Sequence, residues 1–181
     1  MNRWAFVAAV ASLSGSSTAV GAFTRAGDSS VSFTAVGPAG MKIVGNTADL
    51  DVSDGPGTVR VTVPLAHLTT GIDLRDRHMR EKYLEAAVFP TAVLEVPRAA
   101  IDVPPPGSER SGTAAATMTL HGRSHPVIVR YTAKGEANTW TVSGSLTLDM
   151  HDYGIQVPSY LGVTVKPGVD IAARFLIRAS P

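Results

Sequence analysis

The sequence contains no cysteine, few aromatic residues and no excess of charge of either sign. The absence of cysteine excludes a disulfide-stapled scaffold, a thiolate zinc site and a cysteine nucleophile. Lysine and arginine number 16 and aspartate and glutamate 15, which gives a net charge of +1. So small a charge supplies no large attraction for nucleic acid phosphates or anionic headgroups. A chain of 181 residues is long enough for one domain with a sizeable core.

Long hydrophobic runs are also missing, except for a short one near the amino terminus. A basic start at 1–3 is followed by ten mostly apolar residues at 4–13 (WAFVAAVASL) and by small residues up to Ala22. The apolar run is about half as long as a membrane-spanning helix, and this order of segments is typical of a cleaved export signal. We therefore predict a signal peptide at 1–22 and a soluble, periplasmic or secreted domain at 23–181.

Alternation of apolar and polar residues with a period of two dominates the rest of the chain. It is clearest at 58–65 (TVRVTVPL) and 140–150 (WTVSGSLTLDM), and it indicates antiparallel strands with one solvated face. Weaker runs bring the expected strands to eight: 30–36, 42–52, 92–103, 113–120, 127–134 and 169–178. Tight turn chemistry joins several of them, and 104–108 (PPPGS) predicts an exposed loop. The pattern predicts an all-β fold, either an up-and-down barrel or a sandwich.

One segment departs from the strand pattern. Residues 74–84 (LRDRHMREKYL) place Met79 and Tyr83 four positions apart, with charged residues around them. This spacing predicts a short amphipathic helix of about three turns. A helix inside a long connection between strands often has a task, such as covering the mouth of a barrel.

Four motifs occur in the order that one known family displays. They are 69–79 (TTGIDLRDRHM), 120–127 (LHGRSHPV), 152–155 (DYGI) and 169–171 (VDI). Together they resemble the YceI-like polyisoprenoid-binding proteins, and the resemblance extends from Ser29 to the end of the chain. Near its start the chain differs, because Asp28 and Gly37 stand where the family has histidines. Any role of those two family histidines is therefore not expected of Asp28 and Gly37.

The resemblance implies an eight-stranded antiparallel lipocalin-like barrel, with one short helix in a long loop. It also implies an elongated apolar cavity for an isoprenoid quinone or a polyprenyl phosphate, and no catalytic residues. Alternation by itself indicates burial and leaves a filled core or a cavity open. Our candidate cavity-lining residues are the inward-facing aliphatics and one aromatic: Val59, Val61, Val63, Leu65, Met118, Leu120, Val142, Leu146, Leu148, Ile171, Ala173, Phe175 and Ile177.

The predicted helix supplies the candidates for a mouth or lid. They are Leu74, Arg75, Asp76, His78, Met79 and Tyr83. Arg75, Arg77 or His78 could meet a pyrophosphate or a quinone head, since a planar guanidinium suits phosphate oxygens. For Asp76 we favour a structural role, in which the carboxylate pairs with an arginine or holds loop amides.

Signals for catalysis are weak. His121 and His125 are spaced like zinc ligands, but Gly122 and Pro126 place them across a turn, and no third ligand accompanies them. No G-x-S-x-G elbow is present, so we predict no enzyme, metal or cofactor.

We therefore expect a protein that binds an isoprenoid or other long-chain lipid for transport, storage or sequestration. We expect no nucleic acid partner and no transmembrane segment, and a homodimer is left open. The alternative is a stress-response or interaction scaffold with a filled core that docks partners through the 74–84 helix. A weak hydrolase is a third hypothesis, based only on its histidines and aspartates.

Overall fold

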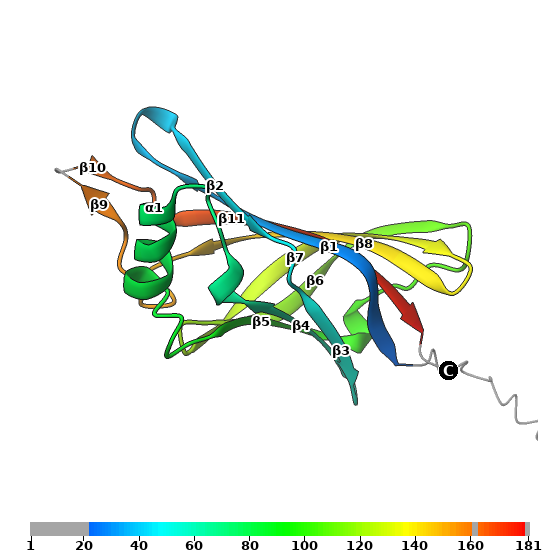
Figure 1. Ribbon diagram of the computed structural model, residues 1–181. Helices are drawn as coiled ribbons and strands as arrows, with labels where there is room; N and C mark the ends of the chain where they lie inside the picture. Colours follow the sequence, from blue (N-terminus) through cyan, green and yellow to red (C-terminus); the bar gives the residue numbers. More distant parts are fainter. Residues whose placement is uncertain (1–21, 161–162, 180–181) are drawn as a thin grey trace, which may run out of the picture.

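The computed structural model describes residues 22–160 and 163–179. The predicted signal peptide, apart from Ala22, lies outside the described residues. Within them the chain forms a closed antiparallel barrel of eight strands (Figure 1). The predicted all-β, eight-stranded antiparallel barrel is thus confirmed, with one 11-residue helix.

The barrel closes because the last long strand pairs with the first. Its strands are β1 (Phe23–Val36), β2 (Lys42–Thr47), β3 (Asp51–Gly55), β4 (Thr58–Pro64), β5 (Thr91–Pro97), β6 (Glu109–Leu120), β7 (Arg123–Glu136), β8 (Thr139–Asp149) and β11 (Gly168–Ala179). Both β2 and β3 pair with β1 and together form one interrupted strand, the one predicted at 42–52. A separate small hairpin consists of β9 (Ser159–Tyr160) and β10 (Val163–Thr164).

One side of the barrel, which we call the long wall, consists of β6, β7, β8, β11 and β1. These strands are 11 to 14 residues long. The β6–β7 hairpin turns at His121 and Gly122, whose φ angles are 50° and 71°. Two consecutive positive φ values are characteristic of a type I′ turn, which matches the twist of paired strands. This tight turn keeps β6 and β7 in continuous register from Glu109 to Leu120.

The other side, the short wall, consists of β2, β3, β4 and β5, which are only 5 to 7 residues long. Its two seams with the long wall are held unequally, because β2 pairs with β1 along its whole length, 42–47 against 31–36. β5 pairs with β6 only over 93–95, and β1 pairs with β3 only at Thr24 and Ser53. The β5–β6 seam and the β3 part of the β1 seam are therefore held by fewer ladder hydrogen bonds than the long wall.

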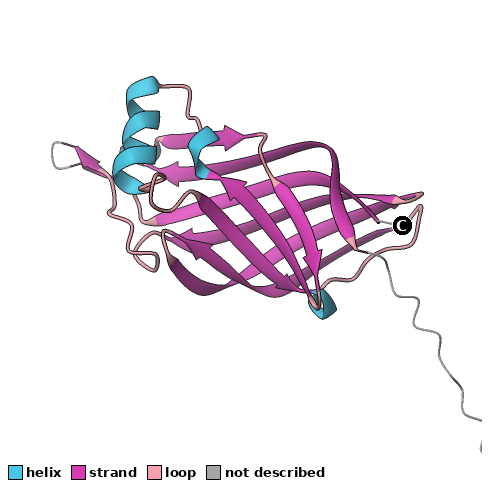
Figure 2. Cartoon of the chain, turned by 60° about the horizontal axis from the view of Figure 1, so that its bottom comes forward, coloured by secondary structure: helices cyan, strands magenta, loops and turns pink. Residues whose placement is uncertain are grey.

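A segment we call the strap, residues 98–108, connects β5 to β6. It begins with the 3-10 turn η4 (Arg98–Ala100) and crosses the barrel end opposite the helix (Figure 2). Its proline-rich part is the loop that the sequence predicts, and Pro105, Pro106 and Gly107 are exposed, but Pro104 is fully buried. Proline has no N–H to donate to a ladder, but the Pro104 carbonyl accepts a hydrogen bond from Trp140 Nε1 at 2.8 Å.

The helix lies across the opposite end of the barrel, in the connection between β4 and β5 (Figures 1 and 2). It consists of α1 (Asp73–His78), which continues into the π turn η3 (Met79–Tyr83). The predicted helix at 74–84 is confirmed. Within the described ranges, every helix is too short or too polar to cross a membrane.

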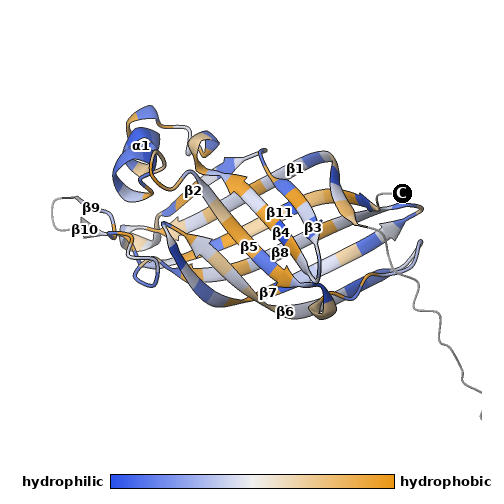
Figure 3. Ribbon diagram, turned by 90° about the horizontal axis from the view of Figure 1, so that it is seen from below, coloured by the Kyte–Doolittle hydropathy of each residue, from blue (hydrophilic) through white to orange (hydrophobic). Residues whose placement is uncertain are grey.

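Buried apolar side chains form two clusters inside the barrel, and Figure 3 shows the apolar bands along the strands. The helix-end cluster includes Leu65, Leu68, Leu120, Leu148, Met150 and Tyr153. The far-end cluster consists of Phe23, Val31, Leu50, Val52, Val59, Trp140 and Ile177. The interior is therefore packed differently at its two ends.

Candidate functional site

The barrel encloses a cavity of about 150 Å³. Its walls consist of Val, Leu, Ile, Ala, Met and Phe side chains, together with Trp140 and the glycine at 144. The polar side chain on the wall is that of Tyr131, since Ser145 borders the cavity but is exposed on the outer face, and no charged side chain lines the wall. A cavity of this composition suits a hydrocarbon group, because an ionised or strongly polar ligand atom there would lose its hydration without gaining a partner.

Most of the candidate lining residues do lie on this wall. The set comprises Val59, Val61, Val63, Met118, Val142, Leu146, Ile171, Ala173, Phe175 and Ile177. Leu65, Leu120 and Leu148 do not, and belong instead to the helix-end cluster. The alternation gives their inward direction correctly, but residues 150–155 and Leu68 fold into this end of the barrel and fill it. The cavity therefore stops short of the helix.

Several lining residues were missing from our candidates. Phe23, Val31 and Val52 come from β1 and β3, and Ile101 and Val103 come from the strap. The period-two pattern could have found Val31 and Val52, which alternate with polar neighbours. No local signal identifies the strap residues, because their direction depends on how the segment crosses the barrel end.

The cavity is elongated along the strands. It extends from Trp140 to Leu146 on β8 and from Ile171 to Ile177 on β11. Six residues in an extended strand span about 20 Å. Gly144 lies midway along this stretch, and a Cβ atom there would have its nearest neighbour, Val129 Cγ1, at 3.7 Å. The missing side chain at this position thus contributes to the empty volume.

Aromatic and charged groups close the far end. The rings of Phe23 and Trp140 meet edge to face with centroids 5.4 Å apart. The guanidinium of Arg98 lies 4.0 Å from the centroid of the Phe23 ring and forms an ion pair with Asp54. Asp54 also accepts a hydrogen bond from the Phe23 amide at 3.1 Å. Because Trp140 holds Pro104, this network links the strap to both walls.

Tyr153 occupies the helix end of the barrel and is 1% exposed. Burial, and then the charge of Asp152, raises the pKa of Tyr153, and its hydroxyl has no hydrogen-bond partner among the described residues. The rings of His125 and Tyr153 meet edge to face at 5.3 Å. His121 contacts the Tyr153 carbonyl through Nδ1 at 3.1 Å and Glu85 through Nε2 at 2.5 Å. The two histidines thus pack around a closed end.

Asp76 fixes the start of the helix to the preceding loop. It is 4% exposed and accepts hydrogen bonds from Thr69 Oγ1 at 2.6 Å, from the Thr70 amide at 2.7 Å and from Thr70 Oγ1. Burial raises the pKa of Asp76, but these hydrogen bonds and the charge of Arg80 outweigh it and lower the pKa to about 2. Holding a loop amide is the structural role favoured by the sequence. Arg75 supports the same loop by donating to Thr70 Oγ1 at 2.7 Å.

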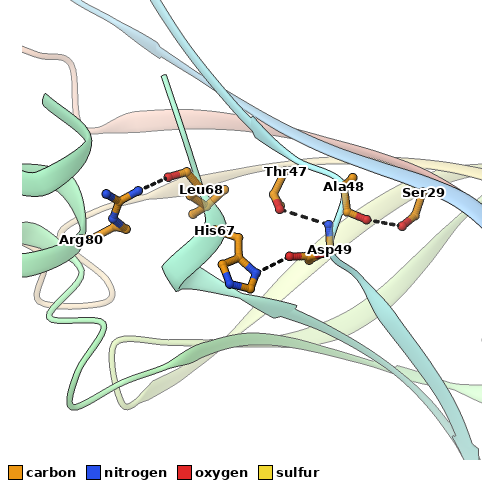
Figure 4. Close-up of polar contacts among 7 residues, drawn as sticks. All are labelled: Ser29, Thr47, Ala48, Asp49, His67, Leu68 and Arg80. Carbon is orange, nitrogen blue, oxygen red and sulfur yellow. Dashed lines mark hydrogen bonds and ion pairs between the residues drawn. The ribbon is translucent and has the colours of Figure 1, made fainter. Parts of the chain in front are cut away.

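The other helix residues do not reach the cavity either. Leu74 and His78 are exposed, whereas Met79 and Tyr83 pack against the helix-end cluster. Arg80 donates to the Leu68 carbonyl at 3.0 Å, beside the contact of His67 with Asp49 (Figure 4). Of the three apolar residues Leu74, Met79 and Tyr83, only Leu74 is exposed, so they form no continuous apolar docking patch. The helix covers the barrel end as an anchored cap, and none of our six mouth candidates lines the cavity.

A closed eight-stranded antiparallel barrel with an apolar interior cavity defines a lipocalin-like binding architecture. A family model described as the YceI-like domain matches residues 6–176. The chain belongs to this family.

Similar proteins agree with that assignment. A polyisoprenoid binding domain from Saccharophagus degradans, implicated in plant cell wall breakdown, has 18% sequence identity and a TM-score of 0.74, over 87% of this chain and 98% of that one. BcnA of Burkholderia cenocepacia has 17% identity and a TM-score of 0.65, over 83% and 96%. Identities this low show the fold alone.

Curated relatives cover less of the chain. Proteins called UPF0312 protein from Pseudomonas savastanoi pv. phaseolicola and Pseudomonas syringae pv. syringae are 29% identical over 107 residues. That is 55% of this chain and 53% of each relative. The chain thus spans about half the length of the curated relatives it matches.

Proposed function

We propose that this protein is an exported, non-enzymatic carrier that holds the hydrocarbon tail of an isoprenoid lipid in the barrel cavity. The observation that carries the proposal is the wall of the cavity, which is apolar over about 20 Å of strand. Each CH₂ group buried there gains about 0.8 kcal/mol. The amino-terminal segment supports export, and the YceI-like fold supports an isoprenoid over other hydrocarbons.

The polar head of the lipid stays outside the cavity in this proposal. No charged side chain lines the wall, and a buried quinone or phosphate oxygen without a hydrogen-bond donor would be costly. An isoprenoid quinone and a polyprenyl phosphate both satisfy this condition, since each has an apolar tail and a polar head at one end. The protein would transport, store or sequester such a lipid.

The proposal is tested by measuring the mass of the purified protein before and after organic extraction, using native mass spectrometry. We expect a co-purified apolar molecule in the wild type and much less in Gly144→Val. The valine side chain would project into the empty volume beside Val129, without a backbone clash at Cβ.

The matched control is Gly168→Val at the start of β11. A Cβ atom at Gly168 has no neighbour within 4 Å, and the residue does not line the cavity. This variant should keep its lipid. Equal loss in both variants, or no extractable molecule and no uptake of added isoprenoid by the wild type, would contradict the proposal.

A further inference from the structure

The outer face of the long wall carries a grid of small polar side chains. Strand register aligns two neighbouring rows across β1, β11, β8, β7 and β6. The first row is Ser30, Arg174, Ser143, Thr132 and Ser111. The second row is Ser32, Ala172, Ser145, Arg130 and Thr113. These residues border a shallow cleft of about 580 Å³ on the outside of the barrel.

Two arginines flank the middle of this cleft. Arg130 comes from β7 and Arg174 from β11, on either side of β8, which contributes only Ser143, Gly144 and Ser145. Strands two positions apart in a sheet are separated by roughly 10 Å, which two arginine side chains can span between them. The floor between them has no long side chain, so both guanidinium groups can reach a ligand that lies over β8.

The charge of the cleft is uncompensated. Neither Arg130 nor Arg174 forms an ion pair within residues 22–160 and 163–179, although the arginines at 60, 98 and 110 do. No aspartate or glutamate lines the cleft. The groups that face it are guanidinium N–H donors and hydroxyls, and guanidinium groups bind phosphate oxygens in a bidentate manner.

We propose that this cleft, which we call the polar furrow, binds a phosphorylated polyol, with the phosphate between Arg130 and Arg174. A phosphate alone would fill little of 580 Å³. The serine and threonine hydroxyls on both sides supply partners for the hydroxyls of an attached sugar or glycerol. The furrow lies outside the barrel wall, so the inference is independent of the proposed lipid cavity.

The same chemistry is presented by a soluble sugar phosphate or glycerol phosphate and by a glycerophospholipid headgroup. The experiment has one arm for each source. Glycerol 3-phosphate is titrated into the full protein at low ionic strength and followed by the amide NMR signals of Ser143 and Ser145. In parallel, co-sedimentation is measured with phosphatidylglycerol vesicles and with phosphatidylcholine vesicles.

The double variant Arg130→Ala/Arg174→Ala should weaken binding at least tenfold in each arm of the experiment in which the wild type binds. We expect Arg130→Lys/Arg174→Lys to weaken binding several-fold, because an ammonium keeps the charge but lacks the planar fork. Lys42→Ala/Arg60→Ala removes the same charge from the short wall and should change binding less than twofold. Rising salt should weaken the interaction, since the furrow is exposed to solvent.

Binding of glycerol 3-phosphate identifies a soluble ligand, and binding of phosphatidylglycerol vesicles alone identifies a headgroup. Three results would overturn the proposal. They are no binding in either arm, an equal loss in the Lys42 and Arg60 control, and a change of oligomeric state in the double alanine variant. The last would make this face an interface between copies of the chain. Uptake of apolar lipid should be unchanged in every variant.

Discussion

The long wall and the short wall enclose the same cavity but are built differently. Strands of 11 to 14 residues with two tight hairpins form the long wall, whereas strands of 5 to 7 residues form the short wall. At the seam between β5 and β6 only 93–95 pair, and the strap covers the barrel end beside it. Regions with few ladder hydrogen bonds open at lower free energy than continuous sheet. The difference predicts that the long wall maintains the barrel and that the strap side opens more readily, which makes it the expected entry route for the lipid of the proposed function.

The largest expected effect comes from removing the side chain that joins the strap to the long wall. Trp140→Ala deletes an indole that is 8% exposed and its contact with Phe23. We expect the free energy of unfolding to fall by about 3–5 kcal/mol. Urea unfolding followed by circular dichroism measures this fall. Ile128→Ala on the outer face of β7, where the side chain is 61% exposed, should cost no more than about 0.5 kcal/mol.

Trp140→Phe separates the two contributions of this residue. It retains an aromatic ring beside Phe23 but removes the hydrogen bond from Nε1 to the Pro104 carbonyl. A loss of about 1–3 kcal/mol is expected for a buried acceptor left without its donor. If Trp140→Phe were as unstable as Trp140→Ala, packing against Phe23 would contribute little and the strap bond would dominate.

A smaller effect is expected on the short-wall side, at the loop between β4 and the helix. Asp76→Asn removes the carboxylate that accepts from Thr69 and Thr70. We expect the free energy of unfolding to fall by about 1–3 kcal/mol at neutral pH. Asp73→Asn, on the exposed first turn of the same helix, should cost less than about 1 kcal/mol.

The pH dependence provides a second test of Asp76. Its pKa is lower in the folded protein than in an unfolded chain, so its contribution is fully present above the ordinary value of 3.8 and is lost as the pH falls toward about 2. Between these limits the stability of the wild type should decline more steeply than that of Asp76→Asn. Parallel curves for the two proteins would show that Asp76 is not the group responsible.

The contrast between the walls also explains which features the sequence reveals. Val59, Val61 and Val63 alternate without interruption, so their strand and their inward face can be predicted. β1 begins at Phe23, whereas the sequence predicts a strand only from Ser30. The register shifts between Ala26 and Ser29, and this break in the alternation hides the first part of the strand. Irregular backbone of this kind depends on pairing with a distant strand, β11, which no local pattern encodes.

The sequence pattern does not predict the strap or the extent of the cavity, for a related reason. The run at 92–103 predicts one strand, but β5 ends at Pro97 and 98–100 form a 3-10 turn. Leu120 and Leu148 have the same inward direction as the lining residues. They are excluded from the cavity only because 150–155 fill that end, and such filling depends on tertiary packing and not on periodicity.

The smallest expected effect tests the strap directly. Tyr131 on the long wall accepts a hydrogen bond through its hydroxyl from the Asp102 amide at 2.8 Å. Tyr131→Phe keeps the ring that packs over Gly112 and removes only this acceptor, so the free energy of unfolding should fall by about 0.5–1.5 kcal/mol. If the strap is the part that opens, hydrogen exchange at the Asp102 amide and the rate of lipid exchange should both rise. Thr147→Val, which removes the bond from Thr147 Oγ1 to Asp170 on the outer face, should leave both rates unchanged. Faster amide exchange without faster lipid exchange would place the route of uptake elsewhere in the barrel, because the strap would then open without admitting the ligand.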